Sequence, residues 1–222
     1  GTLGSGNHFA ELQYVSEIYD APVAAAFGLR LDQVTIMLHS GSRGLGHQVC
    51  QDHLRVMVDA SRRYGIALPD RQLCCAPLES PEGRRYLAAM SAAANFAFAN
   101  RQVMAHWVRE SVAEALEIAP EATQLDTLYD VCHNIAKLET FGSTCHGAGR
   151  RMSRRQATRV GDARGLLDEL RARGIHVRAA GLATVAEERP EAYKDVADIV
   201  RIEHGAMTIP SVKNDPLAIV AP

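Results

Sequence analysis

Four histidines in this chain have small or polar neighbours, whereas a histidine in an ordinary core is surrounded by apolar residues. They are His8, His39, His133 and His146. A neutral imidazole can bind a transition metal, act as a base or act as a nucleophile, and glycine lets a backbone come close to a ligand. Arginines follow two of the four histidines, and a guanidinium binds phosphate through paired hydrogen bonds. This combination predicts a metal-dependent site that handles phosphate groups.

Three of these histidines, His8, His39 and His133, lie at or near the end of an expected β-strand, where a rigid sheet can hold a metal ligand in place. Three imidazoles can bind a divalent first-row metal, with oxygen or sulfur ligands completing the coordination shell. The alternative is that the three histidines are unrelated and make ordinary hydrogen bonds, because the partners that orient a metal-bound imidazole cannot be read from sequence.

The fourth histidine, His146, is followed by a stretch of small residues, 147–149, and then by Arg150. The small residues leave space in which a phosphorus centre can approach a ring nitrogen in line, and Arg150 can neutralise phosphate oxygens as charge develops. The motif therefore fits a histidine that forms a covalent bond to phosphorus. A glycine-rich turn with a surface histidine would show the same local pattern.

Two basic features fit a phosphate-binding role. Arg43 lies in a Gly/Ser loop after His39, where it either binds phosphate or is a surface residue of a turn. Six arginines between residues 150 and 164 are accompanied by one acidic residue, Asp162, and on a helix they would form a basic stripe. Such a stripe is either a footprint for an RNA backbone or a solvated helix face.

The elements that must position these residues follow from hydrophobic periodicity and capping signals. Strands are expected over residues 8–15, 34–38, 125–132, 175–179 and 217–220, with 34–38 buried. Helices are expected over 21–27, from about 47 to 65, from Pro81 toward 118 with a break near Asn100, and over 150–159, 163–173 and 190–200. Helices and strands mix without a regular βαβ rhythm, which favours an α+β fold.

Composition and charge narrow the class of protein. The chain has 222 residues, 47% of them apolar and 23% charged, which is ordinary for a globular protein with one large or two small domains. Abundant alanine predicts closely packed helices, and a net charge of −2 does not by itself indicate a nucleic-acid binder. The five cysteines form no CxxC pair, which argues against a disulfide framework and predicts a cytoplasmic protein. No apolar run has the length of a membrane span.

Four longer motifs closely resemble those of the RtcB-type RNA-splicing ligases. They are residues 1–11, 39–47, 130–137 and 141–150, and residues 81–83 and 190–196 also fit the family's pattern. The motifs stand in the family's order, and the resemblance covers nearly the whole chain. It implies a single RtcB-like catalytic domain over residues 1–222, α+β in class, with mixed sheets and flanking helices around a central cleft for metal and GTP.

The resemblance implies an RNA ligase that joins a 2′,3′-cyclic phosphate or 3′-phosphate end of RNA to a 5′-hydroxyl end, in tRNA splicing or RNA repair. The family uses GTP and manganese, here expected as two Mn²⁺ ions, and often works with a helper protein called archease. A histidine attacks the α-phosphate of GTP to give a histidine–GMP adduct, and the GMP then passes to the RNA 3′-phosphate. The expected partners are therefore RNA, GTP and archease, without a membrane.

The resemblance also assigns roles to single residues of this chain. His146 matches the histidine that carries GMP, and His8, His39 and His133 match the metal ligands. The GTP contacts match Asn7, Glu11, His133, Asn134, His146, Gly147, Ala148 and Gly149, and the basic residues near RNA or phosphate match Arg43, Arg150 and Arg154. On a regular strand Glu11 and His8 would face opposite sides, because they are three residues apart.

The chain departs from the family's pattern in three places. The family's metal site also uses an Asp and a Cys from a segment that would precede Gly1, and a long stretch with a basic motif would lie between Lys137 and Leu138; we expect the full protein to contain both. Residues 220–222 include no lysine where the family has one that contacts guanine. Two other functions stay open: a metal-dependent phosphoesterase on the same scaffold and a non-catalytic RNA-binding homologue.

Overall fold

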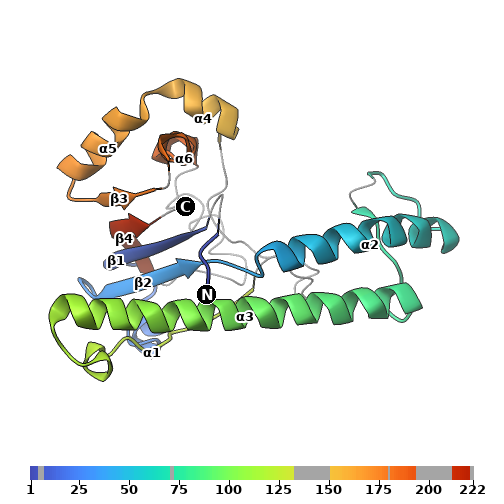
Figure 1. The fold of residues 1–222 in the computed structure, drawn as a ribbon, viewed down its shortest axis with the longest axis horizontal. Helices are drawn as coiled ribbons and strands as arrows, with labels where there is room; N and C mark the ends of the chain where they lie inside the picture. The colour runs from blue at the N-terminus through green and yellow to red at the C-terminus, as the bar shows by residue number, and fades with distance from the viewer. Residues whose placement is uncertain (5–7, 71–72, 133–150, 180, 194–211, 221–222) are drawn as a thin grey trace. The chain divides into compact units, whose positions relative to one another are not determined.

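The computed structural model describes the chain except for residues 5–7, 71–72, 133–150, 180, 194–211 and 221–222 (Figure 1). It divides into two compact units, one formed by Gly1–Thr2 and Ser40–Ile135 and the other by Leu3–His39 and Ala136–Pro222. Helices and strands occur together, which confirms the mixed fold expected from the sequence. The single catalytic domain and its central cleft stay predictions.

Two long helices form the frame of the first unit. α2 spans Gly44–Arg63 and α3 spans Pro81–Leu116, and the two lie side by side and run in opposite directions (Figure 1). Both helices bury alanine, since Ala60, Ala93 and Ala97 are no more than 7% exposed. Small side chains let helix axes approach closely, and the close packing predicted from the abundance of alanine is confirmed.

The start of α3 follows directly from its sequence. The Ser80 hydroxyl accepts a hydrogen bond from the backbone N–H of Gly83 at 3.0 Å, and Pro81 takes the first helical position. Glycine is required at position 83, because a Cβ there would lie 2.3 Å from the carbonyl oxygen of Pro77. The predicted break near Asn100 is wrong. The helix is continuous there, because the Asn100 amide bonds to neighbouring segments and does not compete for the helix backbone.

The segment after α3 forms a short 3-10 turn, η2, over Pro120–Thr123 and then continues without regular secondary structure to residue 132. The strand predicted over 125–132 is therefore wrong. The segment is held to α3 instead, where Arg109 donates hydrogen bonds to the Leu125 carbonyl at 2.7 Å and to the Thr127 hydroxyl at 3.1 Å. Alternation of apolar and polar residues cannot distinguish a segment laid along a helix from a strand in a sheet.

A four-stranded sheet, in the order β2-β1-β4-β3, forms the centre of the second unit in the part of the chain that the structure describes. β1, Phe9–Ile18, pairs antiparallel with β2, Val34–His39, and with β4, Val212–Val220. β3, His176–Arg178, pairs parallel with β4. The sequence predicts all four strands, but the prediction that residues 34–38 are buried is wrong, because β2 is an edge strand and is partly exposed along its length.

Short helices complete the second unit. They are α1 at Ala21–Ala26, α4 at Arg154–Val160, α5 at Ala163–Ala172, α6 at Leu182–Glu187 and the 3-10 turn η4 at Pro190–Ala192. A buried cluster of Ala163, Leu166, Val185 and Ala186 joins α5 to α6. The later part of the helix predicted over 190–200 lies outside the described residues. None of the helices described here has both the length and the hydrophobicity to cross a lipid bilayer.

Candidate metal and phosphate site

The pairing of β1 with β2 brings two of the predicted metal histidines together. Phe9 lies opposite His39 in the antiparallel register, and His8 directly precedes Phe9. The ring centroids of His8 and His39 are 6.0 Å apart, with the ring planes at 82°. The Phe9 ring packs edge to face against His39 at 5.2 Å, so an apolar side chain restricts the orientation of this imidazole.

The histidine pair fits a transition-metal ion. Two imidazoles that share one ion have ring centroids about 4.5 to 6.5 Å apart, because each coordinating nitrogen lies about 2.1 Å from the metal. The separation of His8 and His39 falls within this range, and both side chains are only partly buried. The described residues include no group of three possible ligands, and the third predicted ligand, His133, lies outside them.

Glu11 is a predicted GTP contact on β1. It lies two residues after Phe9 and therefore on the same face of the strand as Phe9. Its carboxylate accepts a hydrogen bond from the side-chain amide of Gln13 at 3.0 Å. Burial raises the pKa of Glu11, and the hydrogen bond from Gln13 opposes this shift. A partly buried carboxylate of this kind gains stability from a bound cation or from an N–H donor of a ligand.

Arg43 ends the turn after His39 and begins α2. Its backbone has φ 57° and ψ −145°, a conformation in which residues other than glycine are strained. Its Nε donates a hydrogen bond to the Thr2 hydroxyl at 3.2 Å. The turn is tight, since a Cβ at Gly46 would lie 2.1 Å from the Ser42 hydroxyl oxygen. A strained arginine at the positive end of a 20-residue helix fits a phosphate-binding role.

The basic stripe expected over residues 150–164 does not form as one helix face. α4 begins only at Arg154, so Arg151 lies before the helix. Arg154 is also paired with two carboxylates, Glu187 at 3.8 Å and Glu188 at 3.5 Å. An RNA phosphate at Arg154 would therefore have to compete with these acidic side chains.

The other predicted site residues lie outside the described residues. They are Asn7, His133, Asn134, His146, Gly147, Ala148, Gly149 and Arg150. Their roles stay predictions, including the role of His146 as the residue that carries GMP.

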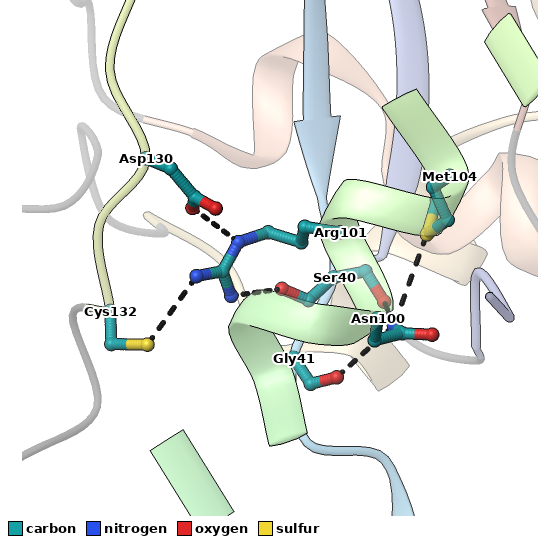
Figure 2. A network of polar contacts seen from close by, with 7 residues as sticks. All are labelled: Ser40, Gly41, Asn100, Arg101, Met104, Asp130 and Cys132. Atoms are coloured by element: carbon teal, nitrogen blue, oxygen red, sulfur yellow. Dashed lines mark hydrogen bonds and ion pairs between the residues drawn. The ribbon is translucent and has the colours of Figure 1, made fainter. Parts of the chain in front are cut away.

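A polar network in the first unit was not predicted from the sequence, and Asn100 on α3 is one of its two centres (Figure 2). The Asn100 side-chain oxygen accepts the backbone N–H of Thr2 at 2.7 Å, and its Nδ2 donates to the Thr2 carbonyl at 3.0 Å. The same Nδ2 lies 3.1 Å from the Ser40 hydroxyl and 3.2 Å from the Gly41 carbonyl. Asn100 thus contacts both the start of the chain and the turn after His39.

Arg101, the next residue of α3, is the second centre of this network (Figure 2). Its Nε bonds to the Asp130 carboxylate at 2.5 Å, one terminal nitrogen donates to the Ser40 carbonyl at 3.2 Å, and the other lies 3.5 Å from the Cys132 sulfur. The Arg101 side chain is 9% exposed and that of Asp130 18%. The pair is therefore nearly buried and linked to two other segments.

A sequence signal for this network does exist. Ala93, Ala97 and Met104 mark the buried side of α3 at helical spacing, and Asn100 and Arg101 fall on the same side. Polar side chains on a buried helix face need partners, so the helix itself predicts a hydrogen-bonded site here. It does not predict which segments supply the partners.

Comparison with known proteins gives one consistent result. The sequence matches the profile of the family described as tRNA-splicing ligase RtcB, over residues 1–141 and 136–220. It is 43% identical to the tRNA-splicing ligase RtcB of Thermococcus kodakarensis, over 93% of this chain and 56% of that protein. For the proteins of the same name from Methanococcus maripaludis and Pyrococcus furiosus, the identities are 39% and 43%, over 99% and 91% of this chain.

The chain spans 59% of the Methanococcus maripaludis protein and 27% of the Pyrococcus furiosus protein, so it corresponds to only part of its relatives. The matched segments contain the histidine pair on β1 and β2, Arg43 and the Asn100–Arg101 network. On the profile match and these identities over nearly its whole length, the chain belongs to the RtcB family of tRNA-splicing ligases.

Proposed function

We propose that the protein is an RNA ligase that joins a 3′-phosphate end of RNA, or a 2′,3′-cyclic phosphate end after its opening, to a 5′-hydroxyl end, with GTP and manganese. The observation that supports this most is the His8–His39 pair, held 6.0 Å apart by the β1–β2 register in a chain of the RtcB family. The two imidazoles can supply ligands for a metal, and Arg43, which follows His39 in the sequence, can supply a cation for phosphate.

The proposed reaction uses His146 as a nucleophile. A ring nitrogen of His146 attacks the α-phosphorus of GTP, the bond to the β-phosphate breaks, and pyrophosphate leaves. An oxygen of the RNA 3′-phosphate then attacks the GMP phosphorus, which frees His146 and leaves the RNA end activated. Finally the 5′-hydroxyl attacks the RNA phosphate, GMP leaves, and a phosphodiester bond is formed.

Three histidines of this chain would hold manganese: His8 and His39 from the two paired strands, and His133. When bound, the metal supplies positive charge that stabilises the phosphate oxygens as charge develops on them. The chain's own residues orient the ligands. Phe9 restricts the His39 ring by edge-to-face packing, and the antiparallel register fixes the spacing of His8 and His39.

Glu11 and Arg43 would bind the nucleotide and the RNA end. Burial removes water from the Glu11 carboxyl group and raises its pKa, and an N–H donor of a bound ligand, such as that of guanine, would replace part of this lost hydration and lower the pKa again. Arg43, at the start of α2, would hold phosphate oxygens with its guanidinium. Asn7, Asn134, Gly147, Ala148, Gly149, Arg150 and Arg154 are the further nucleotide and RNA contacts in this proposal.

The biological setting belongs to the same proposal. The substrates would be the RNA ends produced in tRNA splicing or by RNA breakage, archease would be a helper, and the protein would act in the cytoplasm. The names of the relatives support the role in tRNA splicing.

Labelled GTP tests the proposed chemistry. When the full-length protein is incubated with manganese and GTP labelled at the α-phosphate, label should stay on the protein at neutral pH and be released in acid, as a phosphorus–nitrogen bond requires. His146→Ala should carry no label, whereas His47→Ala, a change at another histidine of the matched motifs, should carry the wild-type amount. Absence of label on the wild-type protein, or equal label on His146→Ala, would contradict the proposal.

A further inference from the structure

We propose that Asn100 and Arg101 are positioning residues that hold the chain segments leading into all three predicted metal ligands. This inference rests on the proposed function only in taking His8, His39 and His133 as the ligands. The two residues do not touch the metal or the nucleotide in this proposal. They act through the backbone of the segments that carry the ligands.

Each of the three segments has a contact with α3 within the first unit. Thr2 lies six residues before His8 and exchanges two hydrogen bonds with Asn100. Ser40 directly follows His39, and its carbonyl and hydroxyl oxygens bond to Arg101 and Asn100. The third contact concerns the segment before His133.

That third segment ends at Cys132, which directly precedes His133. Arg101 bonds to the Asp130 carboxylate and to the Cys132 sulfur in this segment. Two neighbouring residues of one helix therefore connect three segments that are far apart in the sequence and that each lead to a predicted ligand. Figure 2 shows the contacts with two of them, at Ser40–Gly41 and at Asp130–Cys132.

The chemistry of the two side chains suits this task. Three different nitrogens of the Arg101 guanidinium bond to three different groups, on Ser40, Asp130 and Cys132. The guanidinium is planar and rigid, so these three groups are fixed relative to one another. A lysine at this position has one ammonium group on a flexible chain and cannot reproduce the three contacts together.

The burial of Asn100 and Arg101 indicates that the network positions chain segments and does not serve mainly to stabilise the fold. Asn100 and Arg101 are 7% and 8% exposed, and a buried ion pair is weak evidence for stability because its desolvation offsets the attraction. The neighbours on the same face of α3 are alanine and methionine, so an apolar side chain could fill this site. A polar pair with seven hydrogen bonds to three segments holds those segments in a defined arrangement instead.

The test compares conservative variants of the full-length protein. Arg101→Lys keeps the positive charge and removes the three-pronged geometry, and Asn100→Asp keeps the acceptor for Thr2 and removes the Nδ2 donor. Arg84→Lys is the matched control, because Arg84 lies on the same helix but makes an exposed ion pair with Glu79 at 3.5 Å. Manganese affinity is measured by titration with electron paramagnetic resonance detection, and the free energy of unfolding by urea without metal.

Loss of a partner that orients metal ligands weakens metal affinity by about 10- to 100-fold. We expect this loss in Arg101→Lys and Asn100→Asp, with labelling by GTP restored when manganese is raised in proportion, while Arg84→Lys keeps the wild-type affinity. The inference would be overturned if Arg101→Lys and Asn100→Asp both fold and bind manganese with wild-type affinity. It would also be overturned if the loss of manganese affinity is fully explained by the fall in the free energy of unfolding. A wild-type protein that binds no manganese would instead refute the proposed function.

Discussion

Replacing His39 by alanine is expected to abolish high-affinity manganese binding in the full-length protein and to reduce RNA joining by more than about 100-fold. Loss of a residue that only orients a metal ligand already lowers metal affinity or activity by about 10- to 100-fold, and loss of the ligand itself should cost more. The variant should still fold. His39 contacts the rings of His8 and Phe9 at the edge of a sheet, and such ring pairs contribute only about 0.5 to 1.5 kcal/mol each. Manganese titration and a joining assay on the same preparations measure both effects.

The matched control for this variant is His106→Ala. His106 is an exposed residue of α3 that pairs with Glu110 at 3.4 Å, so its loss should leave both metal binding and joining at the wild-type level. If His39→Ala binds manganese as tightly as the wild type and joins RNA at the same rate, the β1–β2 histidine pair is not part of the metal site.

Replacing Arg43 by glycine is expected to separate activity from stability. Glycine adopts the backbone conformation of φ 57° and ψ −145° without the strain that a side chain meets there, which amounts to about 1 to 3 kcal/mol. The loss of the Thr2 contact and the added freedom of the unfolded chain offset part of this gain. The free energy of unfolding should therefore stay equal or rise by about 1 kcal/mol, while joining falls by about 10²- to 10³-fold as a phosphate-binding cation is lost.

Glu117→Gly provides the corresponding control for backbone strain. Glu117 has φ 54° at the end of α3, so glycine there should also relieve strain but should not change joining. A fall of joining in Glu117→Gly equal to that in Arg43→Gly, or full activity in Arg43→Gly, would show that the arginine side chain has no part in the reaction.

Local signals explain why much of the fold was predictable. The alternation in β1, the short apolar run in β2, the Ser80–Pro81 start of α3 and the Asp162 cap of α5 are all determined by residues within one turn or one strand. The segment over 125–132 was not predictable in this way. Its hydrogen bonds come from Arg109 on a helix that precedes it, and a local pattern does not contain that partner.

In the candidate site, too, some features were predictable from local sequence and others depend on distant residues. The sequence predicts His8 and His39 at or near strand ends, and in the structure their ring centroids lie 6.0 Å apart; their role as metal ligands stays a prediction. The Asn100–Arg101 network was missed because its meaning depends on contacts over sequence separations of 29 to 98 residues. The basic stripe was predicted from arginine spacing alone, whereas the start of α4 is set by the Ser153–Gln156 capping box, four residues later than expected.

The most direct measurement follows one phosphorus atom through the joining reaction. The full-length protein is given an RNA strand labelled in its 3′-phosphate and a second strand with a 5′-hydroxyl end, with GTP and manganese. We expect a joined product that requires both GTP and manganese and that keeps the label in the new phosphodiester bond. Release of the label as free phosphate without GTP, or RNA binding that needs no metal and yields no joined product, would contradict this expectation.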